Sequence, residues 1–393
     1  MSWETAKLGD ISSNIQTGPF GSQLHQSDYS EEGTPVVMPK DLIDGHISEA
    51  SIARVSIEHV ELLSRHKIEN GDILYSRRGD VGRCAFATEK EKGWLCGTGC
   101  LRVTIDAKKA ISRFVFYQLQ KPETIGWVEK HAVGATMLNL NTSILGNVPI
   151  EVPPIEAQSR IVEILSAYDN LIENNQKQIK LLEEAAQRLY KEWFVNLRFP
   201  GYEDTPIDDG VPEGWEIKRL VDIADVQYGY AFDGSLFNSD GHGTPIVRIR
   251  NIPSGNTSDF TTETADEQYL IHNGDVLVGM DGEFHVNSWP GNDAYLVQRT
   301  CCFRPRNSSM QGWLLWAIYE PIKFFEKTVV GATVAHLGKK HIDTIRLLIS
   351  PDKLYVPFQM FFEKRQVLLN QNRKLTEARD RLLPKLMSGE IEV

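Results

Sequence analysis

The strongest constraint on the fold is a repeat, because most of this chain is written twice. GATMLNL begins at Gly134 and GATVAHL at Gly331, and NGDILYSRRGD from Asn70 corresponds to NGDVLVGMDGE from Asn273. KLGDISSNIQTGPFGSQL near the start corresponds likewise to RLVDIADVQYGYAFDGSL. A repeat of about 200 residues is far longer than the roughly 20–50 residues of a solenoid unit. The chain is therefore predicted to hold two large, similar units with pseudo-two-fold symmetry and two similar working surfaces.

Length and composition predict a multi-domain globular protein. At 393 residues the chain exceeds what one hydrophobic core usually serves. It has no apolar run near the ~20 residues of a membrane span, and MSWETAKLGD lacks the blocks of a signal peptide, so we expect a cytoplasmic chain without membrane association. Five cysteines without C-x-x-C pairs favour buried free thiols over a metal site shared by Cys96 and Cys100.

The net charge of −11 argues against a freestanding nucleic-acid binder, because neutralising phosphates requires clustered Lys and Arg. Basic residues nevertheless cluster in the non-helical halves of the repeat, around Arg77, Arg248, Arg304 and Lys339. Acidic residues concentrate elsewhere, as in YEDTPIDDG. The charge therefore permits a DNA role without requiring one.

Changes of texture along the chain predict its organisation. Short β-type runs such as TPVVM and GDILYS alternate with Gly-rich turns, and helical spacing appears near 111–130 and over 312–328. We predict five segments: a first α/β globule (1–152), a long helix (153–198), a linker (199–213), a second globule (214–350) and a second long helix (351–393).

The first long helix carries the seam of a coiled coil. After Pro153-Pro154, apolar residues recur at alternating steps of four and three. This seam consists of Ile161, Leu165, Tyr168, Ile172, Asn175, Ile179, Leu182, Ala186, Leu189 and Trp193. Because no small globule buries so long a helix by itself, we expect it to pair with the second long helix.

The second long helix is less regular. Arg365 and Arg379 interrupt its seam, Pro384 is expected to kink or end it, and Gly389 is a plausible stop. The seam residues are Phe358, Phe361, Leu368, Asn372, Leu375, Leu382 and Leu386. An antiparallel pair would let each helix cover the other's apolar stripe. The asparagines Asn175 and Asn372 either set the register of this pair or are solvated at a helix crossing.

No catalytic motif stands out in the sequence. The chain has no G-x-x-x-x-G-K-[ST] phosphate loop, no H-E-x-x-H and no G-x-S-x-G. The Asp/Asn-Pro-Pro-aromatic tetrapeptide of amino-methyltransferases and their Gly-rich cofactor loop are also missing. We therefore expect no catalysis, no cofactor and no metal on this chain.

Loops of the first copy have the composition of DNA groove readers. TGPFGSQ is a flexible loop with one aromatic residue, and SRRGDVGR places three arginines and an aspartate on a turn after a strand. Arginine can hold guanine O6 and N7, and aspartate can accept from cytosine N4. The alternative is a solvated turn whose arginines pair with nearby carboxylates. The candidate DNA-binding residues here are Thr17, Phe20, Ser22, Lys40, Arg77, Arg78, Asp80 and Arg83.

The second copy keeps the frame residues and changes the loops. Its turn, GMDGEFHV, is acidic and its first loop, QYGYAFDGS, is rich in aromatic residues. This difference fits two readers of different sequences on one scaffold, or ordinary drift of surface loops after duplication. The candidate DNA-binding residues here are Tyr228, Tyr230, Arg248, Arg250, Asp281, Glu283, His285, Arg299 and Lys339. Residues of the GAT blocks and His131 either reach phosphates through backbone N–H groups or form strand-entry turns.

Taken together, these residues resemble the specificity (S) subunit of type I restriction-modification systems. The resemblance covers almost the whole chain, above all GATMLNLNTSILGNVPIEVPPIEAQSRIVEIL and the closing LTEARDRLLPKLMSGEI. It implies an α+β fold with two α/β target-recognition domains, each reading one half of a split, asymmetric site in double-stranded DNA. Two long antiparallel coiled-coil helices would separate the domains as a molecular ruler.

The resemblance also implies partners. Two modification (methyltransferase) subunits would methylate adenine with S-adenosylmethionine, and ATP-driven restriction subunits (endonuclease and translocase) would join them. S-adenosylmethionine, ATP and Mg are then expected on partner subunits only. The candidate partner-docking residues are Gln158, Ile161, Leu165, Ile172, Ile179, Leu182, Leu189, Trp193, Leu375, Leu382 and Leu386.

One segment departs from the family pattern. LISPDKLYVPFQMFFEK stands where the family usually repeats P-x-x-x-Q, so Pro351 is kept and Gln359 is expected to stand in for Gln158. If partner subunits wrap the DNA, we expect this chain to bind DNA weakly alone and strongly with its modification subunit. The rival functions are a scaffold whose paired domains bind other proteins, and a cryptic enzyme on the same frame.

Overall fold

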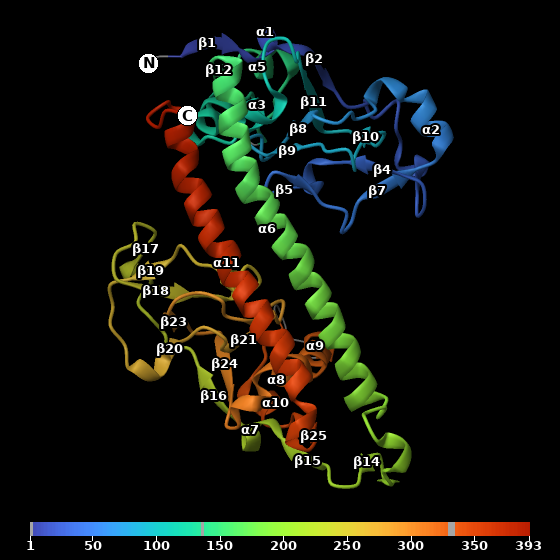
Figure 1. The fold of residues 1–393 in the computed structure, drawn as a ribbon, viewed down its shortest axis with the longest axis vertical. Helices are drawn as coiled ribbons and strands as arrows, with labels where there is room; N and C mark the ends of the chain where they lie inside the picture. The colour runs from blue at the N-terminus through green and yellow to red at the C-terminus, as the bar shows by residue number, and fades with distance from the viewer. Residues whose placement is uncertain (1–2, 135–136, 329–334) are drawn as a thin grey trace. The chain divides into compact units, whose positions relative to one another are not determined.

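The computed structural model (Figure 1) describes residues 3–134, 137–328 and 335–393. The chain divides into two compact units: residues 1–169 with 378–393 form the first unit, and residues 170–377 form the second unit. Each unit combines a strand-rich globule with parts of both long helices, so each is α+β. Among the described residues, no helix has the length and hydropathy needed to cross a membrane.

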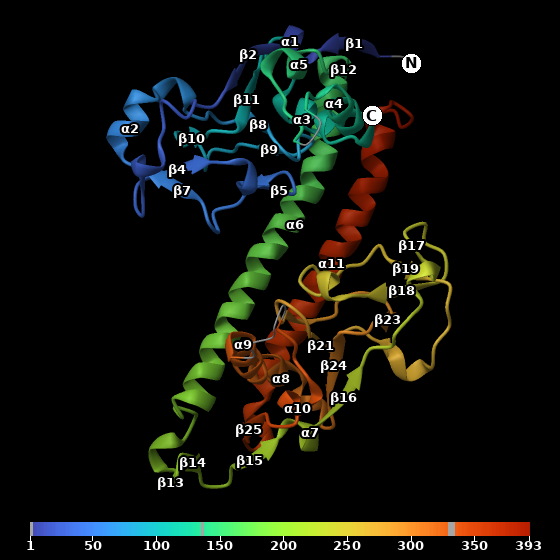
Figure 2. The same cartoon turned by 180° about the vertical axis from the view of Figure 1, so that it is seen from behind.

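The first unit is built on two four-stranded sheets. One antiparallel sheet has the order β2–β11–β8–β9, and the other has the order β10–β4–β7–β3 with β10 and β4 parallel (Figure 2). Two short pairs, β1–β12 and β5–β6, complete it. The strands are β1 (Glu4–Lys7), β2 (Ser12–Thr17), β3 (Tyr29–Ser30), β4 (Thr34–Val37), β5 (Leu42–Ile43), β6 (His46–Ile47), β7 (Ala53–Val55), β8 (Ile73–Ser76), β9 (Cys84–Phe86), β10 (Leu95–Cys96), β11 (Cys100–Ile105) and β12 (Pro149–Val152).

The second unit repeats this topology. Its antiparallel sheet β16–β24–β21–β22 corresponds to β2–β11–β8–β9, and its sheet β17–β19–β18–β23–β20 again holds one parallel pair, β18 with β23. The pair β15–β25 corresponds to β1–β12. The strands are β15 (Glu216–Arg219), β16 (Ala224–Tyr228), β17 (Phe237–Asn238), β18 (Thr244–Val247), β19 (Phe260–Thr261), β20 (Leu270–Ile271), β21 (Val276–Gly279), β22 (Val286–Ser288), β23 (Ala294–Leu296), β24 (Thr300–Pro305) and β25 (Arg346–Ile349). The predicted duplication is thus confirmed in the topology of the sheets, although β5, β6 and β20 have no counterpart strand in the other unit.

Short helices pack on these sheets, and two predicted helices prove to be helix pairs. A proline starts or lies in the first turn of the later helix of each pair, where its missing N–H is tolerated. The short helices of the first unit are α1 (Leu8–Ile11), α2 (Ile57–Leu62), α3 (Ser112–Leu119), α4 (Pro122–His131) and α5 (Thr142–Gly146). Those of the second unit are α7 (Leu220–Ile223), α8 (Gln311–Ala317), α9 (Tyr319–Thr328) and α10 (Lys339–Ile342).

Both predicted long helices are present. Helix α6 spans Ile155–Tyr190 and ends in a π-helical turn, η4 (Lys191–Val195), and helix α11 spans Val356–Met387. Pro384 was expected to kink or end the second helix. It does not end the helix, because α11 continues through it to Met387. Gly389 follows with φ +72°, the left-handed conformation of a helix stop. Between the helices, the acidic stretch contains a hairpin of β13 (Ile207–Asp208) and β14 (Val211–Pro212).

The two long helices pair antiparallel within each unit. In the second unit Asn175 bonds to Asn372 at 2.9 Å, and Arg365 bonds to Glu183 at 2.6 Å. The residue numbers on α11 therefore decrease as those of their partners on α6 increase, as an antiparallel pair requires. In the first unit Asp169 of α6 accepts from Arg379 of α11 at 3.0 Å. The expected seam forms the buried stripe of α6, where every one of its ten residues is buried or half-buried.

The two arginines that interrupt the seam of α11, Arg365 and Arg379, form hydrogen bonds that hold α11 in place. Arg365 is buried and donates to Glu183 of α6 and to Ser288 and Asn287 of the second unit's globule. Arg379 donates to Asp169, whose carboxylate also accepts from the α3 side chains of Arg113 and Tyr117. Apolar seam residues could not make either connection, since Arg365 joins α11 to polar groups of the globule directly and Arg379 does so through Asp169.

A glutamine at the equivalent position of each copy anchors the globule to its helix. Gln158 of α6 accepts from the backbone N–H of Ile111, just before α3. Gln359 of α11 accepts in the same way from the N–H of Gly312, in the first turn of α8. The expectation that Gln359 stands in for Gln158 is confirmed, despite the altered sequence around it.

The seam asparagines bond to each other, and this contact yields a prediction. Asn175 is buried and donates to Asn372, which in turn donates to the carbonyl of Ile172. Replacing Asn175 alone by Leu should lower the free energy of unfolding by about 1–3 kcal/mol, because Asn372 loses its partner. Replacing both by Leu should be neutral or stabilising. Denaturant unfolding of both single variants and the double variant checks this; equal and additive losses would contradict it.

Candidate nucleic-acid interface

In the first unit the SRRGD turn crosses the segment that follows the GAT block. The N–H of Gly79 donates to the carbonyl of Leu138 at 3.0 Å, and the N–H of Leu140 donates to the carbonyl of Arg77 at 2.8 Å. These two bonds place Arg78 opposite Asn139. We call this pairing of two loops the first crossing.

The second unit contains the same pairing. The N–H of Gly282 donates to the carbonyl of Ala335 at 3.1 Å, and the N–H of Leu337 donates to the carbonyl of Met280 at 2.7 Å. Asp281 therefore lies opposite His336, and we call this the second crossing. Two motifs that repeat most faithfully in the sequence thus form one structural element in each unit.

The GAT tripeptides themselves lie largely outside the described residues, which begin again at Met137 and Ala335. A role of their backbone in phosphate contact is therefore carried only as a prediction. His131, the other residue considered with them, stacks on Trp127 with ring centroids 3.9 Å apart, and its Nδ1 lies 2.7 Å from the Trp127 carbonyl.

Side chains at the first crossing divide into paired and unpaired groups. Arg83 and Asp80 form an exposed ion pair at 2.9 Å, as the alternative of a solvated turn requires. The guanidinium of Arg77 lies over the ring of Phe20, 5.8 Å from its centroid, and Phe20 is 52% exposed. Among the described residues, none bonds to the exposed side chain of Arg78. One free cation and one supported aromatic ring therefore lie on this surface.

The second crossing carries a preassembled polar cluster. Nδ1 of His336 lies 2.5 Å from a carboxylate oxygen of Asp281, and Nε of Arg299 lies 3.4 Å from the other oxygen. Glu283 lies on the same turn and pairs with His285 at 3.5 Å and Lys323 at 3.9 Å. The predicted acidic turn is present, but its charges are largely balanced by neighbouring bases.

Arg299 occupies a position that calls for glycine. It adopts φ +70°, and the equivalent position of the first unit is Gly99 with φ +91°. The equivalence is given by the hydrogen bonds, since Gly99 accepts from the N–H of Arg77 and Arg299 from the N–H of Met280. This left-handed conformation costs a residue with a Cβ roughly 1–2 kcal/mol of conformational free energy. The second unit tolerates that cost and places a guanidinium beside Asp281.

The remaining predicted DNA-binding residues make none of the backbone bonds of the crossings, and several of them serve the fold. Arg250 forms two bonds to Asp259, of 2.6 and 2.7 Å, and Lys40 donates to the carbonyl of Ser51. Tyr230 packs edge-on against Phe232 and lies near Tyr269. The others are Thr17 at the end of β2, the exposed Ser22, the half-buried Tyr228, Arg248 over the Phe237 ring, and the exposed Lys339 at the start of α10.

A buried ion pair holds the NGD turn of each unit, which explains why the motif repeats. Asp72 lies 3.6 Å from Arg102 on the neighbouring strand. At the equivalent place Asp275 accepts hydrogen bonds of 2.5–3.1 Å from Arg304. The hydrogen bond to Asp275 raises the pKa of Arg304. The sequence places Arg304 in a basic cluster that would permit a DNA role, but in the structure its guanidinium is bound by Asp275.

Most of the predicted partner-docking residues are buried or half-buried in this chain, and their role in docking stays a prediction. Gln158, Ile161, Leu165, Ile172, Ile179 and Leu386 are buried within their own unit, and Leu182, Leu189, Trp193, Leu375 and Leu382 are half-buried there. The physical reason is that the seam pattern marks the face of each helix that the chain itself covers.

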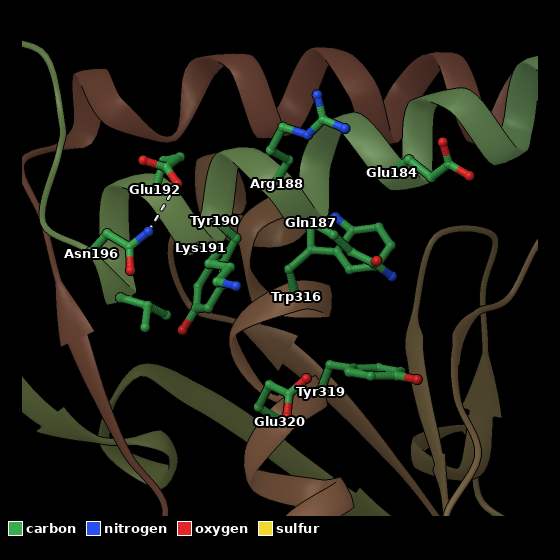
Figure 3. A pocket seen from close by; sticks show the side chains of 11 residues that line it. Glu184, Gln187, Arg188, Tyr190, Lys191, Glu192, Asn196, Trp316, Tyr319 and Glu320 are labelled. Carbon is green, nitrogen blue, oxygen red and sulfur yellow. Dashed lines mark hydrogen bonds between the residues drawn. The ribbon is translucent and has the colours of Figure 1, made fainter.

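The second unit also has an open cavity of about 980 Å³ beside the end of α6 (Figure 3). Aromatic side chains of Tyr190, Trp316 and Tyr319 line it together with three carboxylates and two cations. Burial, aided by the charge of Glu320, raises the pKa of Tyr190 to about 12. None of the predicted site residues lines this cavity. Among the described residues, no group of three His, Cys, Asp or Glu side chains is placed to hold a metal.

All five cysteines are buried free thiols, as the sequence predicts. Burial raises the pKa of Cys84 and of Cys96 to about 12, so both are protonated thiols at neutral pH. A nucleophilic role requires the thiolate, and these thiols therefore serve packing.

Two residues at the crossings were missed in the sequence. Asn139 and His336 occupy equivalent places in the repeat, each five residues after its GAT glycine, and neither is among the predicted DNA-binding residues. Their signal was available, since both follow a repeated motif and differ between copies. The sequence could not show that they lie opposite the turns, because more than fifty residues separate them from Arg78 and Asp281.

Two units of one topology, with different side chains on an equivalent exposed crossing, define a protein with two non-identical recognition surfaces. The family model for the type I restriction modification DNA specificity domain matches residues 1–184 and 212–353. The chain therefore belongs to this family, and its function is sequence-specific DNA recognition as the specificity subunit of such a system.

Individual relatives agree over the full length. The chain is 28% identical to the MjaIX specificity subunit of Methanocaldococcus jannaschii over 100% of this chain and 94% of the relative. It is 21% identical to the HindI specificity subunit of Haemophilus influenzae, over 99% of each chain. The fold is similar to that of the type I restriction-modification S subunit from M. genitalium, with a TM-score of 0.59, 16% identity, and coverage of 98% and 96% of the two chains.

Proposed function

We propose that each unit reads one half of a split DNA site through the surface around its crossing. The observation that carries this proposal is the repeated backbone pairing with different side chains: Arg78 and Asn139 in one unit, Asp281 and His336 in the other. A shared frame fixes where the readers lie, and the variable side chains select the bases. Free arginine and asparagine side chains suit guanine and adenine edges, respectively.

The chain requires help to hold DNA tightly. Its net charge of −11 opposes phosphate binding, and several of its arginines are engaged by carboxylates within their own unit. We therefore assign most phosphate contacts to modification subunits that dock on this chain, as the family resemblance implies. Those partners supply S-adenosylmethionine-dependent adenine methylation, while this chain contributes recognition and no catalytic step.

A duplex titration tests this division of work. The isolated chain and its complex with the modification subunit are each titrated with a labelled duplex at one fixed salt concentration. We expect weak, unspecific binding by the chain alone and tight, site-specific binding by the complex. Tight specific binding by the isolated chain would contradict the proposal, and co-purification with proteins other than a methyltransferase would favour a scaffold.

We place partner docking on the outward faces of the long helices in the second unit. Large apolar side chains outside the covered seam are exposed there, namely Leu171, Leu181, Val195, Val356, Met360 and Val367. On α11 the last three follow steps of four and seven residues, so they share one face. Exposed apolar stripes of this kind indicate a protein partner.

This location gives a prediction that separates docking from stability. Changing Met360 and Val367 to Glu should leave the free energy of unfolding within about 0.5 kcal/mol of the wild-type value, because both side chains are exposed. Binding of the modification subunit should fall more than tenfold, since two charges would be buried at the interface. Co-purification and thermal unfolding measure the two effects. The control is Ser239→Glu, which adds a charge at an exposed residue of the same unit outside the long helices.

A further inference from the structure

The cluster at the second crossing contains a histidine with one ring nitrogen engaged and one free. Nδ1 of His336 faces Asp281, and a carboxylate only accepts hydrogen bonds, so Nδ1 carries the proton. The 3.3 Å approach of Arg299 Nη1 to the same nitrogen is then not a hydrogen bond, since both atoms bear hydrogen. Among the described residues, none bonds to Nε2, and the side chain is 46% exposed. In the neutral form of the ring, Nε2 presents an acceptor to solvent.

The cluster is not needed to hold the crossing together. The first crossing has the same two backbone hydrogen bonds, of 3.0 and 2.8 Å, without any side-chain pair between Arg78 and Asn139. The Asp281–His336 contact must therefore be explained by something other than loop closure.

Backbone strain supports the same conclusion. Arg299 adopts a left-handed conformation, whereas glycine (Gly99) occupies the equivalent position of the first unit. The Arg299 side chain reaches Asp281 and is 57% exposed. Strain of this kind persists where function selects the side chain. The guanidinium orients the carboxylate, and the carboxylate orients the imidazole.

We propose that His336 is a specificity-determining residue of the second half-site, where its Nε2 accepts a hydrogen bond from an exocyclic amino group, N6 of adenine or N4 of cytosine, in the major groove. Asp281 and Arg299 are positioning residues that fix the tautomer and the direction of the ring. The inference rests on the proposed DNA-reading function and names its chemistry at one base. Adenine and cytosine carry the amino donors of the major groove, whereas guanine and thymine present acceptors there.

The test uses the complex of the full chain with its modification subunit. Methylated sites are sequenced for the wild type and for His336→Ala, and duplex binding is measured across salt concentrations. We expect preference at one base of the second half-site to drop roughly tenfold, with the first half-site and the salt slope unchanged. Uniform weakening with a salt slope reduced by about one would make His336 a phosphate contact and overturn the proposal. An unchanged site would also overturn it.

Variants of the two positioning residues separate orientation from mere structure. Asp281→Ala should relax the same base position, and Asp281→Asn should restore it, because the amide oxygen still accepts from Nδ1. Arg299→Gly should raise the thermal midpoint of unfolding and still relax that position, whereas Arg299→Ala should relax it without the gain. Relaxation by Ala that Asn fails to restore would contradict the tautomer assignment.

A matched control lies in the same unit. His272 forms an exposed pair with Asp293 at 2.9 Å, away from the crossing, so His272→Ala should leave both half-sites as in the wild type. If the wild-type complex methylates no split site at all, the proposed function fails. If it does and His336→Ala changes nothing, only this inference fails.

Discussion

Replacing Asp169 by Ala is expected to lower the free energy of unfolding of the first unit by roughly 3–5 kcal/mol. The buried carboxylate accepts from Arg113 at 2.9 Å, from Tyr117 at 2.5 Å and from Arg379 at 3.0 Å. Its removal leaves the guanidinium groups of Arg113 and Arg379 and the hydroxyl of Tyr117 without this acceptor in a partly buried site. Denaturant unfolding, followed by hydrogen exchange in α3 and the end of α11, measures the loss.

A matched control is available on the same arginine. Asp380 also binds Arg379, at 2.9 Å, but its side chain is 57% exposed. Asp380→Ala should therefore cost less than about 1 kcal/mol. Equal losses for the two variants would show that burial of Asp169 is not the cause.

The same site makes stability depend on pH. Burial opposes ionisation of Asp169, but hydrogen bonds from Tyr117 and Arg379 and the charges of Arg113 and Arg379 prevail and lower its pKa below 3.8. Because the folded pKa lies below the unfolded one, this contribution is fully present above pH 3.8 and is lost as the pH falls further. The difference between wild type and Asp169→Ala should hold near neutral pH and shrink in that acid range.

Replacing Gly18 by Ala is expected to cost the first unit roughly 1–3 kcal/mol or more, and to weaken recognition of the first half-site more than tenfold. A Cβ at Gly18 would stand 1.9 Å from the carbonyl oxygen of Gly97, a backbone atom that cannot turn aside. The resulting shift would displace Phe20, which supports Arg77. Thermal unfolding and competition binding with altered half-sites measure both effects.

Controls for this substitution lie in both copies. Gly21 has open space where its Cβ would stand, so Gly21→Ala should be nearly neutral. Gly229 is the counterpart of Gly18, with Val297 oxygen 2.0 Å from the Cβ position, and Gly229→Ala should affect only the second half-site. Loss of both half-sites from one substitution would argue against independent readers.

The sequence predicted the architecture well because the repeat and the helical seams are local or periodic signals. Gln158 and Gln359 could be matched through their place in the repeat although the residues around them differ. Sequence reasoning failed where a residue type has two uses. Arg304 and Arg365 looked like free or disruptive cations, and only their neighbours show that they bind Asp275 and Glu183.

By itself, the sequence determined that there are two similar units, two long helices with a covered stripe, and two loop sets that differ. Periodicity and duplication are written in the order of residues, so no coordinates are needed to find them. The tertiary structure alone decided which seam residues are buried and which loops meet. His336 lies opposite Asp281 because a strand turn and a distant segment share two backbone hydrogen bonds. Such a contact depends on chain folding across more than fifty residues, and no local pattern encodes it.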